Sequence, residues 1–192
     1  MYLEELQTLI DKVNIFKTHF ATIDIRQDSR KHAYVVEKIL RKYGKIDTTL
    51  SEVDDDERIR LIEEEDIRVN PSDFNEDIVI DTIRNIQNLR TIQKRNGEMG
   101  CNRYIISNSE DHWAVLHVLG LFRWCGYDLS EIDFDIVPLF ETMSGMKNSK
   151  AIMQFLFDLS TYRNHVKRRN NIQTIMLGFS DGTKDGGYLR AN

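Results

Sequence analysis

The sequence predicts an α/β fold, a helix-rich partial (β/α) barrel of the TIM type with about four parallel strands and extra helices. Glycine and proline are scarce, at 10 and 2 of 192 residues, which disfavours an all-β sandwich with a turn about every 8–12 residues. Short apolar runs alternate with segments of helical periodicity, the order typical of βα units around a parallel sheet. These runs lack polar alternation, so we expect the strands to be covered on both faces.

The composition argues against several classes of partner. The formal net charge is −5, from 26 basic and 31 acidic residues, and therefore no nucleic-acid or anionic-membrane partner is expected. No apolar run approaches the roughly 18–20 residues of a membrane span, and the N-terminus lacks the apolar core of a signal peptide. The two cysteines have no CxxC spacing, which favours free thiols in a reduced, cytoplasmic setting.

In the first half of the chain, apolar residues at helical spacing predict helices at 2–15 and 30–44. Between them, 19–26 is rich in β-forming residues and predicts the first strand. The acidic stretch 52–66 is interpreted as the solvated face of a helix, with acids favouring the helix N-terminus. A long helix is predicted over 73–95, after a break at Asn-Pro.

In the second half, three further strands are predicted from apolar runs at 101–108, 134–142 and 172–180. Helices are predicted at 109–126, with Ser109 as N-cap, at 148–168, and from about Asp185 onward. Four strands are half of an eight-stranded barrel, which needs about 250 residues. A small open α/β sheet is the alternative architecture.

Each predicted strand is followed by, or ends in, a polar residue: Arg26, Asn108, Glu141 and Asp181. Ligands of parallel α/β folds gather at the carboxyl ends of the strands. Glu141 and Asp181 are therefore candidate ligands for Mg²⁺ or Mn²⁺, which bind through hard oxygen atoms and keep waters or substrate oxygens as further ligands. Arg26 and Lys184 are the candidate anion-binding pair on the same rim.

Five segments resemble, in the same order and at similar spacing, segments of the phosphoenolpyruvate carboxylase family: IDIRQDSRKH (23–32), RYIISN (103–108), IVPLFET (136–142), LFDLSTYRNHV (156–166) and IMLGFSDGTKDGG (175–187). The similarity extends over 18–192. It implies that residues 1–192 form a single partial catalytic-barrel domain, covering about the first half of the barrel, with 45–97 as a helical insertion between the first two strands.

The resemblance implies a carbon–carbon lyase that adds bicarbonate to phosphoenolpyruvate, giving oxaloacetate and phosphate with Mg²⁺ or Mn²⁺. Glu141 and Asp181 match the metal-binding carboxylates of the family. Lys184 matches an active-site lysine that handles bicarbonate or carboxyphosphate, and Arg26 matches an arginine directed at the substrate phosphate. A structural salt bridge to a neighbouring aspartate, Asp24 or Asp28, is the other explanation for Arg26.

The sequence also departs from the family pattern. Phe179 replaces a tyrosine, and Gly182 replaces a serine, which is expected to loosen a loop. The family's glycine- and arginine-rich loop and its catalytic histidine have no counterpart in the 192 residues. The resemblance therefore implies that this chain is a fragment, inactive by itself, whose partners are phosphoenolpyruvate, bicarbonate and the remainder of its own enzyme chain.

Assembly and function have further alternatives. The family is homo-oligomeric (tetrameric), and a half barrel exposes sheet edges, so we expect the chain to dimerise or swap elements through them, or to cover them with its helices at 2–15 and 73–95. A stand-alone α/β binding or interaction module that has lost catalysis is the alternative function. A relative of pyruvate kinase, another barrel enzyme that uses phosphoenolpyruvate, is the third possibility, although it lacks the LFET and SDGTKDGG segments.

The remaining polar and aromatic residues receive structural interpretations. His32 is expected to make a polar contact at a helix start, and His112 and His117, five residues apart, do not share a helix face and are not expected to bind a metal. The basic run 167–169 is interpreted as a solvated helix end stabilised by the helix dipole. Trp113 and Trp124 are expected in the core.

Overall fold

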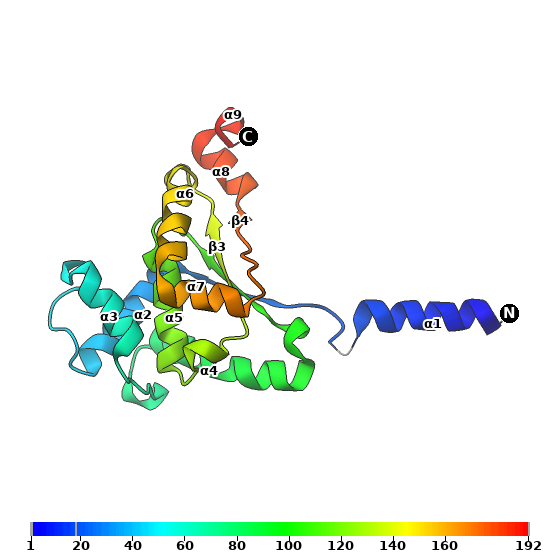
Figure 1. Cartoon of the computed structure of the whole chain (residues 1–192), viewed down its shortest axis with the longest axis horizontal. Helices are drawn as coiled ribbons and strands as arrows, with labels where there is room; N and C mark the ends of the chain where they lie inside the picture. Colours follow the sequence, from blue (N-terminus) through cyan, green and yellow to red (C-terminus); the bar gives the residue numbers. More distant parts are fainter. Residues whose placement is uncertain (1, 18, 192) are drawn as a thin grey trace.

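The structure is a computed structural model, and it describes residues 2–17 and 19–191. Among these residues, four parallel strands form a sheet in the order β1-β2-β3-β4 (Figure 1). The strands are β1 (Asp24–Asp28), β2 (Arg103–Ser107), β3 (Asp135–Phe140) and β4 (Met176–Leu177). Strands that pair in sequence order are typical of a (β/α) barrel, whereas a doubly wound sheet reverses its order. The predicted partial barrel is confirmed.

The helices of the described residues are α1 (Tyr2–Phe16), α2 (Ser29–Lys42), α3 (Asp55–Glu64), α4 (Asp77–Asn96), α5 (Trp113–Trp124), α6 (Met143–Asp158), α7 (Ser160–Arg168), α8 (Phe179–Gly186) and α9 (Tyr188–Ala191). Four 3₁₀ turns accompany them: η1 (Leu50–Glu52), η2 (Pro71–Asp73), η3 (Glu98–Gly100) and η4 (Leu129–Glu131). Helices α2 and α5 pack against each other, and α4 packs against both. The expected solvated helix in the acidic stretch is α3, which buries Leu61 and Ile62.

The two faces of the sheet differ. Because successive strand residues point to opposite faces, alternate residues of the central strands join the main hydrophobic core shared with α2, α4 and α5: Tyr104, Ile106, Ile136 and Phe140. The opposite face contributes a separate small cluster of Ile105, Val137 and Leu139. In the parallel pairing of β1 with β2, Arg26 is the register partner of Ile105. The expectation of strands covered on both faces is right for β2 and β3 and wrong for the outer strands, since Arg26 and Leu177 are exposed.

Helix α1 has no buried residue and projects away from the rest of the molecule (Figure 1). It leaves large side chains such as Leu3 and Val13 exposed. The expectation that helices at 2–15 and 73–95 cover the sheet edges is wrong in its first part, because α1 lies on no strand. Helix α4 belongs to the helical layer beside α2 and α5.

Several element boundaries differ from the expected ones. Strand β4 has two residues instead of the predicted nine, and α8 begins at Phe179, before the predicted start near Asp185. An acid in the first turn, Asp181, and a base in the last turn, Lys184, suit the helix dipole and favour this earlier start. Ser109 is not the N-cap of α5, because its hydroxyl donates to the carbonyl of Ile106, inside β2.

The tryptophans and cysteines lie where expected. Trp113 and Trp124 are buried, and both cysteines are free thiols. Within the part of the chain that the structure describes, no helix combines the length and the apolar character needed to cross a membrane.

Candidate functional site

Arg26 and Glu141 form an ion pair across the sheet. The Nη2 atom of Arg26, on β1, lies 3.4 Å from Oε2 of Glu141, which directly follows β3. The Arg26 side chain is 50% exposed and that of Glu141 15%. The aspartates that could have paired with Arg26 bind other arginines: Asp24 pairs with Arg103 and Asp28 with Arg30. The local salt bridge considered for Arg26 is therefore not formed.

Glu141 also accepts a hydrogen bond from Asn108, the residue after β2. The backbone N–H of Asn108 donates to Oε1 of Glu141 at 2.8 Å. Asn108 has a φ of 57°, a left-handed conformation that asparagine tolerates better than most residues. Its carbonyl accepts a hydrogen bond of 2.7 Å from the hydroxyl of Ser29. Both carboxylate oxygens of Glu141 thus face a donor, which fixes the orientation of the carboxylate.

Gly178 brings β4 against Glu141. A Cβ atom at position 178 would lie 2.5 Å from Cβ of Glu141, a distance that excludes any side chain larger than hydrogen without a backbone shift. The N–H of Gly178 donates to the carbonyl of Phe140 at 2.9 Å. The glycine thus allows the start of α8 to approach the end of β3.

Asp181 and Lys184 form a second pair, on α8. The Nζ atom of Lys184 lies 3.2 Å from Oδ1 of Asp181, and the two side chains are 74% and 53% exposed. Among the residues that the structure describes, no hydrogen bond or ion pair connects this pair with Arg26 or Glu141. The structure therefore brings the four sequence-predicted site residues together as two pairs.

Two glycines of α8, Gly182 and Gly186, allow close packing of this helix against the start of α6. The sequence analysis did not identify them. A Cβ at Gly182 would lie 2.5 Å from Cε of Met146, and one at Gly186 would overlap Sδ of Met143. Gly182 is buried inside a helix, so the expectation that it loosens a loop is wrong. The signal was available in the sequence, since Gly178, Gly182 and Gly186 recur every four residues, which puts them on one helix face.

Asp185 adds a polar connection between the same helices. Its Oδ2 atom accepts a hydrogen bond of 2.8 Å from the backbone N–H of Met143, at the start of α6. An acidic side chain at a helix N-terminus satisfies a backbone donor that lacks a partner within the helix. Asp185 is therefore engaged in structure, and we assign it no place in the site.

The donor atoms suit a divalent cation. Glu141 and Asp181 supply carboxylate oxygens, and Mg²⁺ is usually bound by one or two carboxylates, its other positions going to waters and substrate oxygens. Within 2–17 and 19–191 no group of three His, Cys, Asp or Glu residues is placed to hold a metal ion. The donor types of Glu141 and Asp181 are compatible with Mg²⁺, and each carboxylate is paired with a basic side chain, Arg26 and Lys184 respectively.

Comparisons with known proteins agree with the five segments. The family described as phosphoenolpyruvate carboxylase matches residues 1–192. The chain is 32% identical, over 97% of its length, to a phosphoenolpyruvate carboxylase of Gloeobacter violaceus, and covers 21% of that protein. It is 31% identical to the one of Nitrosomonas eutropha, over 94% of this chain and 20% of that protein. A Synechococcus enzyme of the same name is 32% identical over 98% of this chain and 20% of its own length.

The matches cover nearly all of this chain but only a small part of each relative. The chain spans about a fifth of the length of the curated relatives it matches. Almost all of the chain is nevertheless aligned, and the matched range contains Arg26, Glu141, Asp181 and Lys184. The chain belongs to the phosphoenolpyruvate carboxylase family.

Proposed function

We propose that this chain supplies about the first half of the catalytic barrel of a phosphoenolpyruvate carboxylase, which adds bicarbonate to phosphoenolpyruvate and gives oxaloacetate and phosphate. In this proposal residues 1–192 are one partial barrel domain, and 45–97 is a helical insertion between β1 and β2. The observation that carries the proposal is the Arg26–Glu141 pair, whose glutamate lies beside Gly178 at the ends of the neighbouring strands β3 and β4.

The proposed roles follow from charge. In the reaction of the family, a bicarbonate oxygen attacks phosphorus, and the bond from phosphorus to the enol oxygen breaks, so negative charge develops on both products. The guanidinium of Arg26 is suited to neutralise charge on the phosphoryl group. Lys184 is the catalytic residue proposed to handle bicarbonate or carboxyphosphate. Mg²⁺ or Mn²⁺, held by Glu141 and Asp181, would supply Lewis-acid stabilisation of a negatively charged substrate oxygen.

The isolated chain is proposed to lack turnover. Both Asp181 and Lys184 are more than half exposed, whereas phosphoryl transfer depends on positioned charges in a site that excludes water. The remainder of the enzyme chain is the partner that would close such a site. We further propose a cytoplasmic location, a homo-oligomeric enzyme, and self-association of the isolated chain through the outer edges of its sheet.

Metal binding tests the site directly. We expect the 192-residue chain to bind Mn²⁺ weakly, measured as loss of the free-ion signal in electron paramagnetic resonance. Glu141→Gln and Asp181→Asn should each weaken binding by about tenfold, because each removes one of two charged ligands. Asp66→Asn is the matched control, because Asp66 lies in an exposed surface pair with Arg68. Equal affinities for all four proteins would refute the assignment of the metal ligands.

Turnover is tested separately. Oxaloacetate formation from phosphoenolpyruvate and bicarbonate should not exceed that of a Lys184→Ala control. Turnover clearly above that control would contradict the proposed inactivity.

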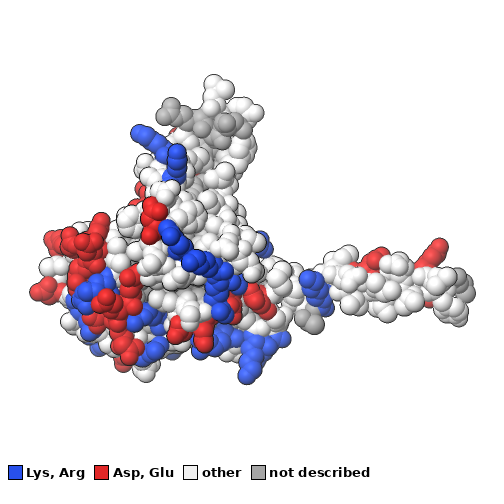
Figure 2. Space-filling view, in the orientation of Figure 1, with Lys and Arg blue, Asp and Glu red and all other residues white. Residues whose placement is uncertain are grey.

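A binding module without catalysis is the alternative function. Figure 2 shows acidic side chains gathered over α3, a surface that could contact a basic partner. This alternative would gain support if Mn²⁺ binding proved insensitive to Glu141 and Asp181.

A further inference from the structure

A cavity lies at the first turn of α6, the helix that packs against α8. Its volume is about 590 Å³, and its lining includes Met143, Ser144, Met146 and Lys147. Both methionine side chains are partly buried, so small solutes in this cavity can reach them. The proposed carboxylation reaction uses neither methionine.

Both methionine side chains lie against glycines of α8. A Cβ atom at Gly182 would lie 2.5 Å from Cε and 3.4 Å from Sδ of Met146. A Cβ atom at Gly186 would overlap Sδ of Met143 and lie 2.6 Å from its Cγ. Each methionine therefore occupies the space that a side chain on α8 would need. An oxygen atom bonded to Sδ of Met143 has no room on the side of Gly186.

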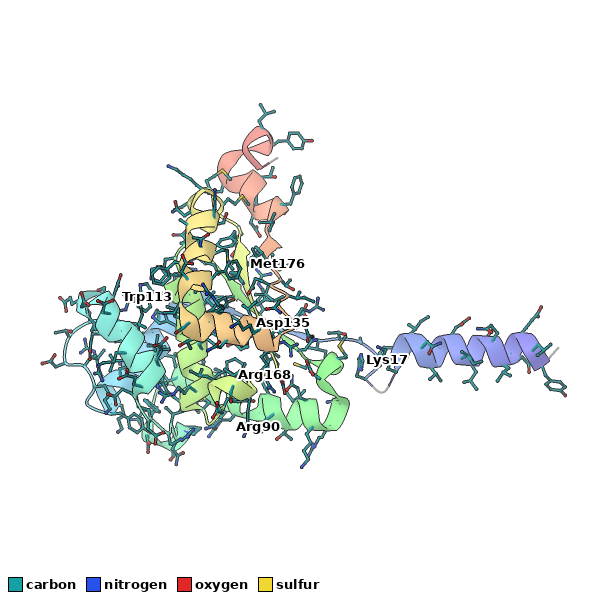
Figure 3. All side chains as sticks on the ribbon, viewed as in Figure 1. Lys17, Arg90, Trp113, Asp135, Arg168 and Met176 are labelled. Atoms are coloured by element: carbon teal, nitrogen blue, oxygen red, sulfur yellow. The ribbon has the colours of Figure 1, made fainter. Side chains whose placement is uncertain are left out.

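Helix α8 depends on this packing. It has eight residues, whereas isolated helices shorter than about 12–15 residues are marginal in water, and glycine disfavours a helix more than any residue except proline. Strand β4, which precedes α8, is held to β3 by two residue pairs. Figure 3 shows α8 beyond the sheet, above the start of α6, with Met176 on the short strand that leads to it. The position of α8 therefore depends on what its glycine face contacts.

We propose that Met143 and Met146 are modification sites, at which oxidation by a peroxide to methionine sulfoxide detaches α8 from α6. A lone pair of the sulfur attacks one oxygen of hydrogen peroxide, so that an S–O bond forms and the O–O bond breaks. The other oxygen leaves as water and takes the proton of the transferred oxygen. Sulfur loses two electrons, and the peroxide gains them. The sulfoxide is polar and favours water over the apolar contact with glycine.

Detachment of α8 has a consequence for the candidate site. Asp181 and Lys184 lie on α8, whereas Glu141 follows β3. A displaced α8 carries Asp181 and Lys184 away from Glu141, so the two proposed metal ligands separate. This consequence rests on the proposed function, whereas the detachment itself does not. Methionine sulfoxide reductases restore the thioether, and the change is therefore reversible.

Treatment of the wild-type 192-residue chain with hydrogen peroxide tests the proposal. Peptide mass spectrometry measures the sulfoxide at each methionine, and amide hydrogen exchange measures the opening of α8. We expect sulfoxide at Met143 and Met146, and exchange in 179–186 that is faster by about tenfold or more, because an unpacked helix of this length opens readily. Exchange in α5 should stay unchanged, since α5 belongs to the main core. Treatment with reductases for both sulfoxide epimers should restore slow exchange.

Other methionines of the chain provide the matched control. Met99 and Met176 are 53% and 39% exposed, so peroxide should oxidise them as well. A double variant, Met143→Leu with Met146→Leu, removes both sulfur atoms at nearly constant side-chain volume and keeps Met99 and Met176. Peroxide should change exchange in 179–186 of this variant by less than about twofold. If leucine already loosens α8 before oxidation, norleucine in place of methionine serves instead, because its side chain is unbranched and has no sulfur.

Three outcomes would overturn the proposal. The first is unchanged exchange in 179–186 after complete oxidation of Met143 and Met146. The second is equal acceleration in the wild type and the double variant, which would make Met176 on β4 the cause. The third is resistance of both methionines to peroxide that oxidises Met99 completely. Exchange in 179–186 is measured without metal, so this proposal and the proposed metal ligands can fail separately.

Discussion

The N–H of Asn108 donates to the carboxylate of Glu141 at 2.8 Å, although the two residues are 33 positions apart. The carbonyl of Asn108 accepts a hydrogen bond from the hydroxyl of Ser29, the first residue of α2. The hydrogen bond to Glu141 therefore connects the carboxyl ends of two neighbouring strands, since Asn108 follows β2 and Glu141 follows β3.

Replacing Asn108 tests its backbone conformation. With φ at 57°, alanine should destabilise the protein by about 1 kcal/mol, because a left-handed conformation is costly for residues with Cβ other than asparagine and aspartate. Asn108→Gly should cost less, since glycine adopts this φ freely. Urea unfolding of the three proteins measures the difference. An alanine variant as stable as the glycine variant would contradict the prediction.

Stability should fall in mild acid because of buried histidines. Burial lowers the pKa of His32 to about 4 and that of His117 to about 3, against about 6.5 in the unfolded chain. The unfolded chain therefore binds more protons below pH 6.5, and stability that is complete above this pH is lost as the pH falls toward 4. At pH 5 we expect a loss of about 2 kcal/mol per histidine.

Urea unfolding at pH 7.5 and pH 5 measures this loss, and NMR titration of the imidazoles identifies its source. The imidazoles of His32 and His117 should both remain neutral at pH 5 in the folded protein, because burial lowers their pKa values. The Nε2 atom of His32 also lies 2.9 Å from the hydroxyl oxygen of Tyr104. Titration of both imidazoles near pH 6.5 would refute the explanation.

Replacement of two adjacent arginines at the end of α7 should lower the stability of the protein by very different amounts. Arg169 is 13% exposed and binds both Asp135 and Glu98 at 2.6 and 2.7 Å. Its replacement by alanine should cost about 3 kcal/mol, because a partly buried carboxylate loses its partner. Arg168 pairs with Asp133 and is 39% exposed, so Arg168→Ala should cost less than about 1 kcal/mol. Thermal unfolding of both variants checks the ranking, which similar losses would contradict.

Replacement by alanine should destabilise the protein at one of two glycines and have little effect at the other. Gly178→Ala places a Cβ 2.5 Å from that of Glu141 and should destabilise the protein by about 1–3 kcal/mol through overpacking, with weaker Mn²⁺ binding as the second readout. Gly120, inside α5, leaves 3.3 Å to the nearest side-chain atom, on Ile62. Gly120→Ala should change stability by less than about 1 kcal/mol, since better helix propensity offsets the contact. Calorimetry compares them, and equal losses would contradict the prediction.

Periodicity and composition were sufficient to predict the order of the elements and the parallel sheet, because apolar runs and helical spacing are local properties. These local patterns gave wrong predictions where a contact with a residue elsewhere in the fold determines the structure. Ser109 has the chemistry of an N-cap, but its hydroxyl binds Ile106 and α5 starts four residues later. The apolar run at 172–180 predicted a long strand, whereas only Met176 and Leu177 pair with β3.

The candidate site shows the same division. A strand end selected Glu141, and a family segment selected Arg26. The expectation that Arg26 ends the first strand is wrong, because β1 is Asp24–Asp28 and Arg26 lies inside it. The sequence also offered Asp24 and Asp28 as partners for Arg26. The interpretation of 167–169 as a solvated helix end is wrong for Arg169, because its side chain is 13% exposed and binds Asp135 and Glu98. These partners are 34 and 71 positions away in the sequence. Partners at such separations depend on packing, which no local pattern encodes.

The order of the strands has a consequence for synthesis. Each described strand after β1 pairs with the strand that precedes it in the chain, so none of these strands needs a later segment before it can pair. A chain that emerges from the ribosome N-terminus first can add one βα unit at a time to a growing edge. Among the described residues, β4 is the newest such edge, and it is formed by only two residue pairs.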